Sequence, residues 1–392
     1  MSTHGTVTRL AGLLVVGTFV FAACSSSGST AAPSAAASAA PTAAASAGAS
    51  EAAASADPMA DLVTAAKAEG QLSVIALPHD WCNYGEIIDG FKAKYGLTVN
   101  EITPDAGSGD EIEAIKNNKD NPGPQAPDVI DVGITFGDQA KADGLIQAYK
   151  VSTWDTIDAN LKDPDGFWYG DYFSVLTFEV NKAAVANTPA DWSDLQKPEY
   201  KNQVALAGDP RQSSQAYNAV YASALSNGGS LDNAEPGLQF FKTLNASGNF
   251  VPTIAKPGTI DTGATPITIR WAYNALAHKV AAAGNPEIDV VVPATGRFLG
   301  VYAQAISAYA PHLNAAKLWM EYLYSDEGQA GWLKGFCHTT RLADLQTKNL
   351  YQDLIAALPD IKGAVYPSKA QAAAAKELIT TQWDTVVGAD VK

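Results

Sequence analysis

Helical and strand-like segments alternate along the chain from residue 58, and this alternation limits the fold more than any other feature of the sequence. Residues 72–77 form a short apolar run closed by Pro78, which is typical of a buried strand. An amphipathic helical pattern precedes this run and stops at Gly70, because glycine favours the left-handed end of a helix. The alternating segments are 59–69, 72–77, 86–95, 97–102, 110–117 and 129–132. Their order predicts a parallel sheet with helices on both faces.

The middle of the chain departs from this rhythm. Residues 168–180 are β-rich and have no helical pattern before them, which indicates the place where the chain crosses to a second lobe. Further strands are expected at 204–206, 266–269, 288–292 and 300–306, and helices at about 213–226, 235–244 and beyond residue 311. We therefore expect two α/β lobes, made of 58–172 with about 284–306, and of 173–283 with C-terminal helices at about 307–392.

The N-terminal segment predicts export. A single basic residue precedes an apolar run, 11–23, that is shorter than the about 20 residues of a membrane-spanning helix and fits a secretory signal peptide. The run ends in Phe-Ala-Ala-Cys, which resembles a bacterial lipobox. We expect removal of 1–23, lipidation of Cys24, and a location at the outer face of the cell membrane or in the periplasm. Ordinary cleavage beside an incidental cysteine stays open. Residues 24–57, mostly small and polar, are interpreted as a disordered Ser/Ala linker.

The composition and the missing motifs exclude several classes of protein. The chain has 41 acidic and 26 basic side chains, a formal charge of −15, which opposes nucleic-acid binding. It has no Gly-Lys dipeptide of a P-loop, no His-Glu-x-x-His, no Gly-x-Ser-x-Gly and no Cys-x-x-Cys. The histidines that follow the signal peptide have no metal-ligand spacing, so we expect no metal, no cofactor and no catalytic residue. A secreted, glycosidase-like hydrolase with paired carboxylates stays open, as does an adhesive surface lipoprotein.

Several short motifs occur in order along the body of the chain. They are Glu69-Gly70-Gln71-Leu72-Ser73-Val74, Asp191-Trp192-Ser193-Asp194-Leu195 with Tyr200-Lys201-Asn202-Gln203-Val204, Gly208-Asp209-Pro210-Arg211 with Ser213 and Ser214, and the tail 314–329. Together they resemble the family-1 extracellular solute-binding proteins of bacterial ABC transporters, which serve ferric iron, polyamines, thiamine and phosphonates. The resemblance implies a type II periplasmic-binding-protein fold, in which crossover hinge strands join two α/β lobes around a cleft. We expect a monomeric receptor that delivers a small molecule to an ABC permease.

Polar and aromatic side chains gather in the segments that would face this cleft. In open α/β sheets ligands bind at the carboxyl ends of strands, here the loops 79–85 and 135–138. The candidate ligand-binding residues are Asp80, Trp81, Asn83, Tyr84, Phe136, Asp138, Tyr169, Tyr172, Arg211, Ser213, Ser214, Trp271, Asn274 and Tyr302. Simpler roles stay open: a surface turn around Trp81, hinge packing of the tyrosines, and an ion pair between Arg211 and Asp209.

The charge of the ligand and the state of two cysteines are the remaining questions. A cationic amine such as a polyamine would suit the acids Asp80, Asp138, Asp171 and Asp209. A phosphonate, sulfonate or carboxylate would suit Arg211, Arg270 and the helix start. Cys82 and Cys337 are the cysteines left once Cys24 is lipidated. Because thiols that lie close together oxidise outside the cytoplasm, we expect a Cys82–Cys337 disulfide. Two separate buried thiols are the alternative.

Overall fold

The structure, a computed structural model, describes residues 57–392. The predicted signal peptide, Cys24 and nearly all of the Ser/Ala linker lie outside these residues. None of the helices within 57–392 combines the length and the apolar character that a membrane span requires.

The strands of the described residues form two sheets. β1 (Gln71–Ile75) and β2 (Thr98–Ile102) pair in parallel, as the alternation predicts. β3 (Val129–Gly133), by contrast, pairs antiparallel with β9 (Leu299–Ser307), because the chain returns to this lobe after building the second one. The sheet that contains them runs in the order β3-β9-β5-β7-β6. Its other strands are β4 (Ile146–Gln147), β5 (Trp168–Asn181), β6 (Val204–Leu206), β7 (Ile267–Trp271), β8 (Ile288–Val291) and β10 (His338–Thr339).

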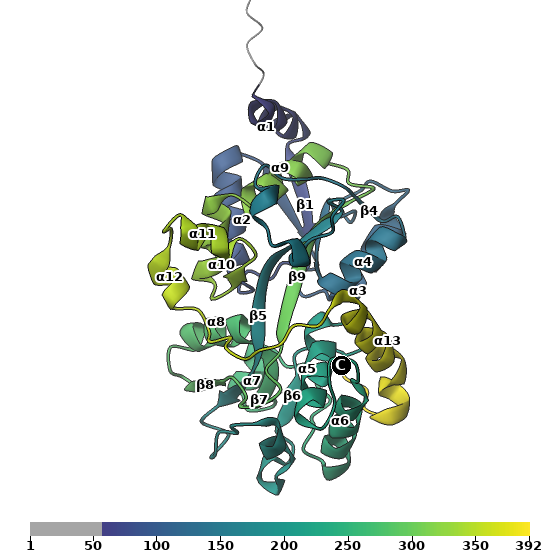
Figure 1. The fold of residues 1–392 in the computed structure, drawn as a ribbon, viewed down its shortest axis with the longest axis vertical. Coiled ribbons are helices and arrows are strands. Elements are labelled where there is room, and N and C mark those ends of the chain that lie inside the picture. Colours follow the sequence, from purple (N-terminus) through teal and green to yellow (C-terminus); the bar gives the residue numbers. More distant parts are fainter. Residues whose placement is uncertain (1–56) are drawn as a thin grey trace, which may run out of the picture. The chain divides into compact units, whose positions relative to one another are not determined.

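Strand β5 joins the two lobes. Residues 168–175 pair antiparallel with β9, whereas Leu176–Asn181 pair antiparallel with β7 and β8. Figure 1 shows β5 and β9 running from the group of elements around β1 to the group around β6 and β7. The confirmed fold is therefore two α/β lobes joined by crossing strands. The predicted lobe boundary at 172/173 falls inside one continuous strand.

Helices cover the sheets of both lobes. In the first lobe they are α1 (Pro58–Glu69), α2 (Tyr84–Tyr95), α3 (Ser108–Asn118), α4 (Ile134–Ala142), α9 (Leu313–Leu323) and α10 (Asp326–Lys334). In the second they are α5 (Ser214–Ser226), α6 (Glu235–Ser247), α7 (Pro257–Asp261) and α8 (Ala272–Ala282). Short helices α11 (Leu342–Thr347) and α12 (Gln352–Ala356) follow α10, and single 3₁₀ turns are Trp154–Thr156, Ala159–Leu161, Trp192–Gln196 and Pro198–Tyr200.

The C-terminal helices, which the predicted boundaries assign to the second lobe, divide between the lobes. α9 packs against α1 and β1, and α10 packs against α2, so both belong to the first lobe. α13 (Lys369–Val386) packs against α5 and α6 of the second lobe and also contacts α4 of the first. The fully buried Trp383 anchors α13 beside Phe241 and Phe250. Amphipathic periodicity predicts helices in the C-terminal segment but not the lobe on which each one packs.

Candidate functional site

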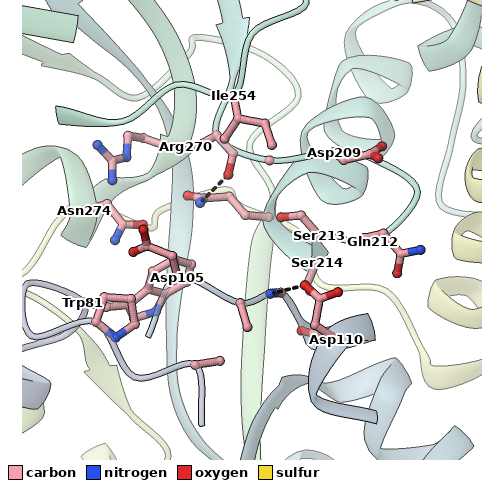
Figure 2. Close-up of a pocket in the computed structure, with 18 of the residues that line it drawn as sticks. Trp81, Asp105, Asp110, Asp209, Gln212, Ser213, Ser214, Ile254, Arg270 and Asn274 are labelled. Atoms are coloured by element: carbon pink, nitrogen blue, oxygen red, sulfur yellow. Dashed lines mark hydrogen bonds between the residues drawn. The ribbon is translucent and has the colours of Figure 1, made fainter. Parts of the chain in front are cut away.

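A cavity of about 390 Å³ lies between the two lobes, where the segments that follow several strands converge (Figure 2). The first lobe contributes the loop after β1, the start of α3 and one residue of β3. The second lobe contributes the segment from β6 into α5, the loop before α7 and the β7–α8 junction. The polar and aromatic side chains that line it are Asp80, Trp81, Asp105, Ser108, Asp110, Glu111, Asp131, Asp209, Gln212, Ser213, Ser214, Gln215, Lys256, Arg270, Asn274 and Tyr302.

A strained turn holds Trp81 at the first-lobe side of the cavity. The next two residues, Cys82 and Asn83, have left-handed backbones with φ of 45° and 67°, a conformation that is costly for residues with a Cβ. A disulfide joins Cys82 to Cys337, with a Cα–Cα distance of 5.8 Å, and fixes this turn to the segment after α10. The indole N–H of Trp81 donates to the Tyr172 hydroxyl at 2.7 Å. Backbone, disulfide and hydrogen bond together set the direction of the indole ring.

The start of α3 forms a second part of the same wall, and sequence reasoning missed it. The Ser108 hydroxyl accepts the backbone N–H of Gly133 at 3.1 Å, and the Glu111 carboxyl accepts that of Asp131 at 2.8 Å. These bonds tie α3 to β3 beside the cavity. The sequence did contain a signal for this part of the wall. The segment follows the carboxyl end of β2, and ligands of open α/β sheets bind at the carboxyl ends of strands, the rule that selected the loops after β1 and β3.

The second-lobe wall is the segment between β6 and α5. The Arg211 Nε lies 2.8 and 3.0 Å from the two carboxylate oxygens of Asp209, which lines the cavity. The guanidinium also contacts Asp384 and Asp390, each at 3.0 Å, so it is used in binding the C-terminal segment. Ser213 caps α5 with its hydroxyl. The simpler role left open for Arg211, an ion pair with Asp209, is therefore present in the structure.

Both basic side chains that line the cavity are already paired. Lys256 of the second lobe lies 2.7 Å from Asp105 of the first, which makes a solvent-exposed ion pair between the lobes. Arg270 Nη1 lies 3.0 Å from the buried carboxylate of Glu179. The other oxygen of Glu179 contacts His278, and this hydrogen bond raises the pKa of His278. Each of the two cations therefore has an acidic partner, although Arg270 Nε has no hydrogen-bond acceptor among the described residues.

Carboxyl groups dominate the cavity lining. Six of them, against the two paired cations, belong to Asp80, Asp105, Asp110, Glu111, Asp131 and Asp209. Burial raises the pKa of Asp131 to about 7 and raises that of Glu111 well above its ordinary range, so these two lose charge near neutral pH. Of the other four, Asp105 is paired with Lys256 and Asp209 with Arg211, whereas Asp80 and Asp110 have no basic partner among the described residues. Within residues 57–392 no three His, Cys, Asp or Glu side chains are grouped so that they could hold a metal ion.

The structure brings six of the fourteen candidate residues to the cavity wall. These are Asp80, Trp81, Ser213, Ser214, Asn274 and Tyr302. Tyr84 and Tyr172 lie one layer behind, where both hydroxyls donate to Asp131, at 2.8 and 2.7 Å. The Trp271 ring is fully buried behind the wall. Asn83 precedes α2 and does not line the cavity, and its amide donates to the Glu86 carboxylate and the Gly331 carbonyl, each at 3.2 Å. These four support the wall and do not line it.

Three further candidates lie away from the cavity. Because β3 ends at Gly133 and α4 begins at the next residue, no loop carries Phe136 and Asp138 toward the ligand space. Phe136 instead faces α13, where the Lys376 ammonium lies 3.1 Å from the centre of its ring. Asp138 accepts a tryptophan indole N–H at 3.0 Å. Tyr169 is buried and packs against another tyrosine, the hinge packing that stayed open.

The two lobes touch closely at one end of the cavity. Gly133 of β3 lies against the start of α5, so that a Cβ at position 133 would come within 2.7 Å of the Ser214 Cβ. Beside this contact the hydroxyls of Thr135 and Tyr217 hydrogen-bond across the lobes at 2.8 Å. Only glycine allows this approach of the lobes.

The fold and the interlobe cavity define a binding protein of the type II periplasmic-binding class. The profile of the bacterial extracellular solute-binding protein family matches residues 125–348, more than half of the chain, and the protein belongs to this family. It is 28% identical over 294 residues to an uncharacterized protein of Haemophilus influenzae, covering 69% of this chain and 78% of that one. It is 25% identical over 262 residues to the spermidine/putrescine-binding periplasmic protein of Escherichia coli, covering 62% and 71%.

A solved structure carries the same architecture. The periplasmic binding protein AfuA of Actinobacillus pleuropneumoniae, with fructose-6-phosphate bound, superposes with a TM-score of 0.63 at 22% identity, covering 81% of this chain and 99% of AfuA. This similarity concerns the fold. The family match identifies the protein as a bacterial extracellular solute-binding protein, and the superposition shows that it shares the fold of a periplasmic binding protein.

Proposed function

We propose that this protein captures a small cationic amine of the polyamine class in the interlobe cavity and delivers it to an ABC permease. The excess of carboxyl groups in the lining is the observation that carries the proposal. An ammonium ion that enters the cavity meets Asp80 and Asp110, two exposed carboxyl groups of the first-lobe wall that no described cation pairs with. The spermidine/putrescine-binding relative of Escherichia coli supports the same ligand class.

Aromatic rings at the cavity suit an ammonium group as well. Trp81 and Tyr302 stand nearly perpendicular, with ring centres 5.6 Å apart and an interplanar angle of 76°. A cation over the face of an indole gains about 0.5–2 kcal/mol from the ring quadrupole. The cavity therefore offers an amine both charge and a ring face.

A phosphonate or a similar anion is the second ligand class. The α5 start, with Ser213 and Ser214, faces the cavity and favours negative charge. Against it, Arg211 is paired with three aspartates and Arg270 with Glu179. Because both arginines are already paired with acids, we consider an anion the second choice of ligand after an amine.

Thermal-shift measurements with spermidine, putrescine, 2-aminoethylphosphonate, thiamine and ferric iron test the ligand class. Spermidine or putrescine should raise the unfolding temperature by several degrees in a saturable manner, because a ligand that binds only the folded state stabilises it. D80N should weaken the affinity several-fold. D353N, which removes the same charge from the exposed start of α12, should not. A shift with the phosphonate alone would replace the amine by the anion.

The same samples test the enzyme alternative. The solute should be recovered chemically unchanged after prolonged incubation, as mass spectrometry can show. Turnover would favour the hydrolase, and no response to any small molecule would favour the adhesive lipoprotein.

Membrane attachment through Cys24 is a separate part of the proposal. The lipobox-like sequence before it supports lipidation. In cells, the full chain should fractionate with membranes and C24S should appear in the soluble fraction. Equal fractionation of the two would refute the lipid anchor and leave the binding function untouched.

A further inference from the structure

A β-bulge in the crossing strand places an acidic side chain beneath the cavity. The pairing of β5 with β9 shifts register between Gly170 and Phe173, which leaves Asp171 and Tyr172 in the bulge. The backbone of the bulge is satisfied by Thr340, whose N–H donates to the Asp171 carbonyl at 3.2 Å and whose hydroxyl donates to the Gly170 carbonyl at 2.7 Å. Bulges re-aim side chains beside functional sites. This one directs Asp171 and Tyr172 toward Asp131 on β3.

Asp131 and Asp171 meet in a dry environment. Asp171 is fully buried, and Asp131, which forms part of the cavity floor, is 4% exposed. One oxygen of Asp131 accepts the hydroxyls of Tyr84 and Tyr172. The other oxygen, and Oδ2 of Asp171, are buried and have no hydrogen-bond donor among the described residues.

The two carboxyl groups lie within hydrogen-bonding reach of each other. Ionised carboxylates are acceptors only, so two of them cannot form a hydrogen bond unless one carries a proton. A proton between the two carboxyl groups would also supply the donor that the two orphan oxygens lack. An unprotonated pair would instead hold two like charges side by side out of water, which is a costly arrangement.

No basic group compensates the pair within the described residues that face it. The titratable neighbours are Glu111 of α3, Tyr84 of α2, Tyr172 in the bulge, Tyr273 of α8, Tyr302 of β9 and Tyr324 after α9. Gln304 of β9, which pairs in register with Asp131, contacts Asp171. Burial, and then the charge of Asp131, raise the pKa of Asp171, and burial raises that of Asp131 to about 7.

We propose that Asp131 and Asp171 share one proton and so form a proton-binding site between the cavity floor and the crossing strand. With the proton in place, β3 and the β5 bulge are held together. Its loss adds a negative charge at the cavity floor, and repulsion between the carboxylates then opposes the contact of the two strands. Trp81 is linked to the pair through the Tyr172 hydroxyl, so the indole that lines the cavity is tied to the same site. The proposal goes beyond solute capture, and its test needs no solute.

The test compares the pH dependence of unfolding in the wild type, D171N and D131N. Each variant replaces the shared proton by a permanent amide donor. A group whose pKa is raised on folding stabilises the protein at low pH and loses this effect as the pH rises through the folded-state pKa. Between about pH 4 and 7, the unfolding constant of the wild type should therefore rise by up to about tenfold more per pH unit than that of either variant. D353N, a remote surface control, should keep the wild-type slope.

Infrared spectroscopy provides a second readout that does not depend on variants that fold poorly. At pH 6, the wild type labelled with ¹³C-aspartate should show the C=O band of a buried, protonated aspartic acid. The band should disappear as the pH rises above about 7, and both D131N and D171N should lack it. Equal slopes in all proteins, or no protonated aspartate at pH 6, would overturn the proposal. Neither result bears on whether the cavity binds an amine.

Discussion

The two walls of the cavity are held in different ways. On the first lobe, the turn that carries Trp81 is fastened by a covalent bond, the Cys82–Cys337 disulfide. On the second lobe, the segment that carries Asp209 is fastened by the ion pairs of Arg211 with the C-terminal residues. A disulfide is insensitive to salt, whereas half-exposed ion pairs are screened by it. We therefore expect the first wall to respond to redox conditions and the second to ionic strength.

Of the changes to the two walls, removal of the Cys82–Cys337 disulfide should have the largest effect on stability. C82S/C337S should lower the free energy of unfolding by about 2–5 kcal/mol, because the bond closes a long loop and its loss frees the unfolded chain. Denaturant titration measures the loss, and reduced wild type should match the variant. In the C24S chain, a thiol titration of unfolded, unreduced protein should find no free thiol. Two free thiols would show that Cys82 and Cys337 are not bonded to each other.

Truncation of Trp81 tests whether the turn held by the disulfide contributes a ring to ligand binding. W81A should weaken spermidine binding about tenfold, about 1.4 kcal/mol, because it removes the ring face offered to an ammonium group. W81F keeps a ring but loses the N–H bonded to Tyr172, and it should retain most of the affinity. Isothermal titration calorimetry gives both values. Unchanged affinity in W81A would show that the first-lobe wall does not contact the amine.

Removing Arg211 tests the second wall in the same way. R211A should destabilise the protein by about 1 kcal/mol, because pairs that are partly solvated contribute little each. R211K keeps the charge but cannot contact three carboxylates at once, and it should recover only part of the loss. In about 1 M NaCl the difference between wild type and R211A should shrink. A difference that is independent of salt would mean that packing, rather than charge, holds this wall.

The smallest expected effect is a pH dependence in the second lobe. The hydrogen bond with Glu179 raises the pKa of His278 on folding, so its contribution is present below about pH 6.5 and is lost as the pH rises through the folded-state pKa. The advantage of wild type over H278Q in unfolding temperature should therefore be greater at pH 6 than at pH 9. An equal advantage at both pH values would assign His278 a packing role only.

Local patterns predicted the elements of the fold well. The first two strands, the helices that end at Gly70 and Gly96, and the two-lobed class all follow from periodicity and helix-stop residues. The pairing of β3 with β9 did not, because their register joins residues that are far apart in the chain. Long-range pairing depends on the whole topology, which a single sequence does not display.

The site was predictable where a strand leads into a loop and unpredictable where it leads directly into a helix. Asp80 and Trp81 follow β1 through a loop and reach the cavity. Phe136 follows β3 with no intervening loop, and the first turn of α4 rotates it toward α13. That Arg211 binds the C-terminal segment could not be foreseen, because its partners Asp384 and Asp390 are more than 170 residues away.

The close approach at Gly133 offers a way to separate two events that a ligand titration merges. A methyl group at this position would act as a wedge between β3 and the start of α5, where it would press on Ser214 without replacing any residue that lines the cavity. A receptor wedged in this manner could still gather a solute on one lobe, yet could not bring the other down upon it. A substitution at Gly133 should therefore separate binding of the solute to one lobe from closure of the second lobe over it.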